Sequence, residues 1–91
     1  MEKLYIINDP QGLHARPAEK LINFFRKFDN SIEIHYKNKV VNAKSIMYVM
    51  SLAIRYNEEI KIIINEPEAL KIFKQLDEFN KLMEVPIFKT C

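Results

Sequence analysis

The spacing of hydrophobic residues changes several times along the chain. Residues 3–8 are rich in apolar and β-branched side chains, which predicts a strand that ends at Asn8-Asp9-Pro10. From about residue 15 the apolar positions follow the 3.6-residue period of an amphipathic helix. These positions are Ala18, Leu21, Ile22, Phe25 and Phe28. Pro17 suits the first turn of this helix, where its missing N–H group would have lacked a partner anyway.

The central part of the chain predicts a hairpin followed by a short helix. Apolar and polar residues alternate over 32–36, so we expect a strand with one buried face. Lys37-Asn38 is interpreted as a tight turn, because asparagine tolerates the left-handed conformation, and residues 39–42 as the return strand. Residues 46–52 predict a brief helix, for which Ser45 is a suitable N-cap.

The C-terminal part predicts one more strand and one more helix. Residues 59–65 alternate again, and Pro67 is predicted to open the last helix. The apolar side of that helix comprises Ala69, Ile72, Phe73, Leu76, Phe79 and Met83. Residues 84–91 are expected to form a short irregular tail. The order β-α-β-β-α-β-α, with short connections, favours an α+β sandwich with helices on one face of a sheet.

Composition and charge narrow the functional classes. The 91 residues suit a single domain, and 48% apolar with 29% charged residues is typical of a folded globular protein. The net charge of +2 is too small to indicate a nucleic-acid or membrane partner by itself. Cys91 is the only cysteine, so no internal disulfide is possible. With no signal or membrane segment, we expect a cytoplasmic monomer.

One candidate site lies where the first predicted helix begins. His14 directly precedes that helix, whose free N–H groups and positive dipole end suit a phosphate. Arg16 adds a fixed positive charge with several donors. A neutral histidine can attack phosphorus, so this arrangement suits a phosphoryl relay. Taken alone, however, a histidine near a helix end is more often a cap or a solvated surface residue.

Two segments carry a resemblance to a known family. Residues 12–18 read GLHARPA and residues 41–52 read VNAKSIMYVMSL, and both resemble the signatures of the HPr family of the bacterial sugar phosphotransferase system (PTS). The resemblance extends over residues 3–83. It implies an open-faced β-sandwich of four antiparallel strands with three helices on one side. It also implies that His14 carries a phosphoryl group from enzyme I, charged by phosphoenolpyruvate, to the A domains of sugar-specific enzymes II. Arg16 would stabilise that group and Pro17 would fix the loop-to-helix junction.

The resemblance also gives Ser45 a regulatory role. The matching serine is phosphorylated by an ATP-dependent kinase in many Gram-positive members, so HPr kinase/phosphorylase and a catabolite-control regulator become candidate partners. A phosphoserine at a helix start should stabilise the helix and act on partners through its negative charge. Ser45 is also explained by capping alone.

The short helix has more apolar residues than one buried face can hold. Val49 and Leu52 are predicted to be buried, while Ile46, Met47 and Met50 form an expected docking patch near His14. Ala15 and Lys44 are expected to border this patch. Alternatively, a small domain simply buries more of these residues.

The sequence departs from the family at four positions where glycine is usual, namely Asn38, Tyr48, Ala53 and Asn57. Asparagine is a mild replacement at a positive φ, and alanine is less comfortable there. Tyr48 places a large ring one turn from Ser45, which counts against access by a kinase.

Three other functions fit parts of the sequence less well. A regulatory paralogue acting mainly through Ser45 would typically lack the active histidine, which this chain keeps; a carrier for a nitrogen-related branch is harder to exclude. An RNA-binding sheet would need aromatic residues where residues 60, 62 and 64 are isoleucine. An independent enzyme would need an acid/base pair, a metal cluster or a nucleotide loop. We therefore expect no cofactor, no bound metal and no turnover without partners.

Overall fold

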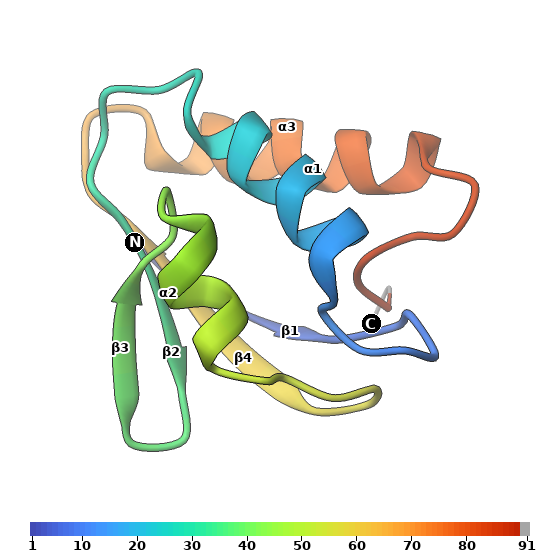
Figure 1. Ribbon diagram of the computed structural model, residues 1–91. Coiled ribbons are helices and arrows are strands. Elements are labelled where there is room, and N and C mark those ends of the chain that lie inside the picture. The colour runs from blue at the N-terminus through green and yellow to red at the C-terminus, as the bar shows by residue number, and fades with distance from the viewer. Residues whose placement is uncertain (90–91) are drawn as a thin grey trace.

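The computed structural model describes residues 1–89 as one antiparallel sheet covered on one face by three helices (Figure 1). The elements follow the predicted order. They are β1 (Glu2–Ile6), α1 (Ala15–Phe25), β2 (Ile32–Tyr36), β3 (Lys39–Asn42), α2 (Ile46–Ser51), β4 (Glu59–Ile64) and α3 (Ala69–Leu82). The predicted α+β fold, a four-stranded sheet with helices on one side, is confirmed.

The strands lie in the order β1-β4-β2-β3, so β4 is inserted between the first two strands of the chain. Ile62 of β4 pairs with Lys3 on one side and with Ile34 on the other. The alternating isoleucines of β2 and β4 point to the helices and are buried, as the period-two pattern predicted. The core therefore lies between the sheet and the helices.

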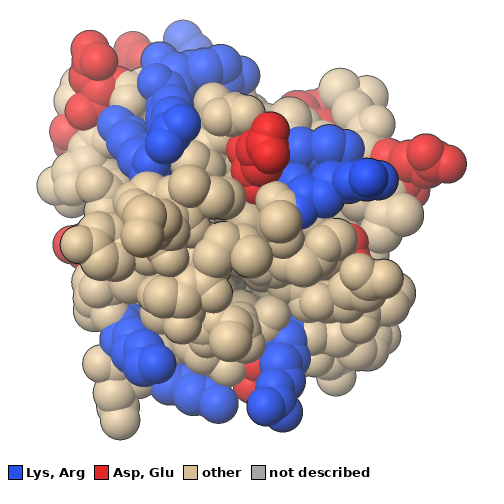
Figure 2. Space-filling model, viewed as in Figure 1, with Lys and Arg blue, Asp and Glu red and all other residues tan. Residues whose placement is uncertain are grey.

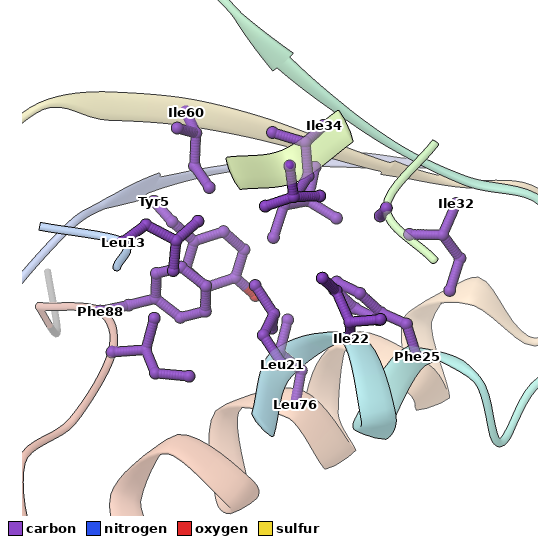
Figure 3. Packing of buried hydrophobic residues seen from close by; sticks show 14 of the residues in the cluster. Tyr5, Leu13, Leu21, Ile22, Phe25, Ile32, Ile34, Ile60, Leu76 and Phe88 are labelled. Carbon is purple, nitrogen blue, oxygen red and sulfur yellow. The ribbon is translucent and has the colours of Figure 1, made fainter. Parts of the chain in front are cut away.

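The helices bury the faces that their periodicity predicted. In α1, Ala18, Leu21, Ile22 and Phe25 are buried, and Phe28 packs against the same core just after the helix. Figure 3 shows Leu21, Ile22 and Leu76 directed from the helices towards Ile34 on the sheet. Phe24 is buried as well, although it lies off the predicted face, because its ring stacks on Phe79 of α3 with 5.1 Å between centroids.

Local backbone details differ from prediction at the turns. At Lys37-Asn38 the left-handed residue is Lys37, with φ 54°, and not the asparagine. Ala53, with φ 51°, and Asn57, with φ 69°, do take left-handed conformations, as expected for positions where the family has glycine. The last helix begins at Ala69 and not at Pro67, because Glu68 has φ 62° and the Glu66 carboxylate accepts the Ala69 N–H (3.2 Å).

The tail is more integrated than predicted. Ile87 and Phe88 are buried, and Phe88 forms an antiparallel bridge with Ile7 after β1. The buried Asn80 side chain donates to the Phe88 carbonyl and accepts from the Phe88 N–H, both at 3.0 Å. The tail segment 84–89 is thus part of the fold, and residues 90–91 of the predicted tail lie outside the described residues.

Candidate functional site

The loop before α1 is held in place by its neighbours on both sides. Asp9 accepts the Gly12 N–H through its carbonyl (2.8 Å), which closes a tight turn. Gly12 has φ +76°, and a Cβ there would lie 2.5 Å from the Ile54 carbonyl oxygen, so no larger residue fits without movement. Leu13 is buried and its N–H donates to the same Ile54 carbonyl (3.0 Å). The next residue is thereby presented at the surface from a fixed backbone.

His14 occupies the N-cap position of α1 and leaves that helix end open. Its backbone is extended, with φ −79° and ψ −176°, and its side chain makes no capping hydrogen bond. Its carbonyl accepts the Ala18 N–H (3.0 Å), which is the first helical hydrogen bond. The N–H groups of Ala15 and Arg16 precede that bond and lack partners inside the helix, while Pro17 has none to offer. The helix therefore presents donors beside the imidazole.

An open hollow of about 750 Å³ surrounds His14. Its charged lining residues are Asp9, Arg16, Lys20 and Glu84. Arg16 and Lys20 both project from α1, are exposed, and form no ion pair with a residue in the described part of the chain. Two cations and a helix N-terminus beside a histidine form a seat suited to a tetrahedral, doubly negative group.

Two parts of this hollow were missed by the sequence reasoning. The sequence predicts only a turn at Asp9, whereas the structure places its Oδ2 3.2 Å from Nε2 of His14. One wall comes from the end of the chain, where Met83, Glu84 and Val85 line the hollow. Ile87 and Phe88 are buried and anchor this segment, but they follow no period from which the anchoring could be predicted.

Ser45 caps α2 as predicted. Its Oγ accepts the Tyr48 N–H at 3.4 Å, and its backbone is extended, with φ −110° and ψ 112°. Its neighbour Lys44 is tied into the fold, since its ammonium donates to the Phe28 carbonyl and its own carbonyl accepts from Arg26 Nε (3.1 Å). These two hydrogen bonds fix Lys44 beside the start of α2.

The predicted apolar patch divides into an exposed part and a packed part. Val49 and Leu52 are buried, as predicted. Met47 is 80% exposed and Met50 is 36% exposed, whereas Ile46 is partly buried and packs against the core. Tyr48, which replaces the family's glycine, is 62% exposed and enlarges the patch. Figure 2 shows an uncharged area over α2 on this face, with Lys and Arg side chains above and below it.

Comparison with known proteins decides the family. Residues 1–81 match the PTS-HPr family, described as the PTS HPr component phosphorylation site. The chain belongs to the HPr family. It is 33% identical over 78 residues to the phosphocarrier protein HPr of Chlamydia muridarum, covering 86% of this chain and 75% of that protein. Phosphocarrier function in the PTS follows from this membership.

Solved HPr structures agree with the fold. A mycoplasma histidine-containing phosphocarrier protein is 37% identical, with a TM-score of 0.79 over 86% of this chain and 89% of that one. The phosphocarrier protein HPr of Bacillus anthracis is 34% identical, with a TM-score of 0.78 over 87% of this chain and 94% of that one.

Among the described residues, no helix is both long and apolar enough to cross a lipid bilayer.

Proposed function

We propose that His14 is the phosphoryl carrier of this HPr family member. The proposal has His14 accept the group from enzyme I, charged by phosphoenolpyruvate, and pass it to the A domains of enzymes II. The observation that carries it is the open N-terminal end of α1. There His14, whose side chain does not cap the helix, lies in one hollow with Arg16 and Lys20. The other histidine, His35, lies on β2 with its ring 3.1 Å from Glu33 and has no such surroundings.

Each residue at the helix end has a distinct role in this proposal. The N–H groups of Ala15 and Arg16 donate to phosphoryl oxygens, and the Arg16 guanidinium neutralises their charge. Pro17 is buried and fixes the helical backbone of the first turn. A phosphohistidine is a high-energy linkage, so the group can pass from His14 to a second acceptor.

The exposed part of the α2 surface supplies the docking patch. Met47 and Met50 are flexible and apolar, which suits a surface that must fit both enzyme I and several A domains. α2 lies beside α1 (Figure 1), and the Leu13–Ile54 hydrogen bond joins the His14 loop to the segment that follows α2. A partner seated on the patch, with Ala15 and Lys44 at its border, would therefore reach His14.

The chain offers a matched control for the test. The protein is incubated with enzyme I and phosphoenolpyruvate, and the intact mass is measured before and after brief acid treatment. We expect one acid-labile phosphoryl group on the wild type and on His35→Ala, and none on His14→Ala. A phosphoryl group on His14→Ala, or none on a folded wild type beside an enzyme I that charges its own carrier, would refute the assignment.

We further propose that Ser45 is a regulatory phosphorylation site. A phosphoryl group there would lie at the positive end of α2 and add nearly two negative charges beside the docking patch. That charge would oppose docking of an acidic enzyme I surface and favour a basic regulator. Incubation with ATP and an HPr kinase/phosphorylase should give an acid-stable phosphoserine that is absent from Ser45→Ala. If Tyr48 restricts access, Tyr48→Gly should be modified faster, and absence of modification in both proteins would exclude the role.

A further inference from the structure

Asp9 makes three separate hydrogen bonds in the loop before α1. Its carbonyl accepts the Gly12 N–H (2.8 Å), its Oδ1 accepts the Gln11 N–H (2.9 Å), and its Oδ2 faces Nε2 of His14 (3.2 Å). The Asp9 side chain is only 16% exposed, against 34% for His14. The backbone of its own turn thus orients the carboxylate independently of its contact with the imidazole.

The chemistry of this contact fixes where the proton lies on the ring. An ionised carboxylate only accepts hydrogen bonds, so Nε2 must be the protonated nitrogen. In a neutral imidazole the other nitrogen, Nδ1, then holds the lone pair. No hydrogen bond joins Nδ1 to any residue among 1–89, and His14 does not use it to cap α1.

We propose that Asp9 is a positioning residue for phosphoryl transfer, holding His14 in the tautomer whose Nδ1 attacks phosphorus. This inference rests on the proposed carrier function of His14. During acceptance, the Nδ1 lone pair forms the N–P bond while the donor's bond to phosphorus breaks and its electron pair leaves with the donor. The Nε2 proton stays in place, so the ring becomes cationic. Asp9 then lies beside the new positive charge and stabilises it.

The placement of charge in the hollow agrees with this role. A carboxylate repels an incoming phosphoryl group, and contact with the nucleophile offsets this cost because the carboxylate then stabilises the positive ring. Asp9 lies against Nε2, while Arg16 and Lys20 supply positive charge to the same hollow. Glu84, the other acid of the hollow, makes no hydrogen bond or ion pair with a described residue.

Asp9→Asn separates the orienting role from the turn. The asparagine oxygen can still accept the Gln11 N–H and so keep the turn, which directs its NH₂ group towards Nε2 of His14. An NH₂ group donates, so the ring should shift its proton to Nδ1 and lose the free lone pair there. Asp29→Asn is the matched control, because it makes the same change of side chain and charge at an exposed residue after α1. Asp29 does not line the hollow, and its side chain makes no hydrogen bond or ion pair with a described residue.

Two readouts make the test decisive. Nitrogen-15 NMR of the unphosphorylated protein reports which ring nitrogen carries the proton, and rapid quench with charged enzyme I gives the rate of phosphoryl acceptance. For Asp9→Asn we expect a shift towards the Nδ1–H tautomer and a rate about 10- to 100-fold lower. Asp29→Asn should keep the wild-type tautomer and change the rate less than about twofold.

Failure of this inference is distinguishable from failure of the carrier function. Wild-type His14 in the Nδ1–H form, an unchanged tautomer in Asp9→Asn, or a changed tautomer with an unchanged rate would each overturn the role of Asp9. If the wild type accepts no phosphoryl group, the carrier function fails and Asp9 loses its role in transfer. Should Asp9→Asn not fold, Asp9→Ser keeps an oxygen for the Gln11 N–H and allows the same comparison.

Discussion

The N-terminal ends of α1 and α2 have similar backbones, but only α2 has a side chain that caps its free N–H groups. Both helices begin after a residue with extended backbone, His14 in α1 and Ser45 in α2. Ser45 turns its side chain back and accepts the Tyr48 N–H, so the end of α2 is closed from within. His14 directs its ring to Asp9 instead, so the end of α1 stays open. A capped end contributes stability, whereas an open end beside a nucleophile offers a seat for a ligand.

Gly12→Ala should disturb the open end most. The new Cβ would lie 2.5 Å from the Ile54 carbonyl oxygen on a residue with φ +76°. We expect about 3 kcal/mol lower free energy of unfolding, because strain and steric overlap combine, and a large loss of phosphoryl acceptance. Urea unfolding measures the first effect and rapid quench the second.

Ala53→Gly is the control for that change, because Ala53 also has a positive φ, of 51°. Here glycine relieves strain, and we expect a gain of up to about 1 kcal/mol with unchanged acceptance. A destabilised Ala53→Gly or a fully stable Gly12→Ala would contradict the described loop geometry.

Arg16→Ala should separate function from stability at the open end. Arg16 is exposed and pairs with no acidic side chain in the described part of the chain, so the free energy of unfolding should change by less than about 0.5 kcal/mol. Loss of a charged donor to the phosphoryl group should reduce the acceptance rate about 100-fold. Arg16→Lys should restore part of the rate. A normal rate in the alanine variant would remove Arg16 from the site.

Ser45→Ala should give the opposite result at the closed end. Loss of the cap leaves the Tyr48 N–H without its acceptor and should lower the free energy of unfolding by about 1 kcal/mol. Acceptance at His14 should stay within about twofold of wild type, because the open end of α1 is untouched. Thermal unfolding and rapid quench on the same sample measure both. If Ser45→Ala kept its stability but lost phosphoryl acceptance, Ser45 would act in transfer and not as a cap, which would contradict the comparison of the two helix ends.

The smallest predicted effect is a pH dependence of stability. It comes from Glu58, in the segment after α2. Hydrogen bonds from the Tyr36 hydroxyl and the Arg55 N–H lower the pKa of Glu58 below its ordinary value of about 4.5. Stability from this carboxylate is therefore present above about pH 4.5 and is lost as the pH falls through the lowered pKa.

Glu58→Gln tests that pH dependence through urea midpoints measured between about pH 6 and about pH 3. The wild type should be the more stable protein at the upper end, and the difference should shrink as the pH falls. A constant difference over this range would contradict the assignment.

Prediction from sequence succeeded where a repeating pattern exists. The period-two spacing identified β2 and β4, and the 3.6-residue spacing identified α1 and α3, each with its buried face, because a side chain's face follows from its position in the repeat. The family motifs selected His14 from the two histidines. The cap at Ser45 could be predicted because its partner lies only three residues away.

What could not be predicted depends on contacts between distant or irregular segments. The pair Ile87 and Phe88 shows no period, so its burial against β1 had no local signal. The Asp9–His14 contact arises only when Gly12 turns the loop. The hydrogen bond from the Lys44 ammonium to the Phe28 carbonyl, just after the C-terminal end of α1, forms only when α1 and α2 lie side by side. Such contacts depend on the packed fold and not on a local repeat.

The most direct test of the open helix end is an amide NMR spectrum of the protein before and after phosphorylation of His14. We expect the N–H resonances of Ala15 and Arg16 to move downfield as they begin to donate to phosphoryl oxygens. The Tyr48 N–H, already engaged by Ser45, should stay in place. If the Ala15 and Arg16 resonances do not move, or if the largest changes occur at the start of α2, the phosphoryl group does not lie at the end of α1.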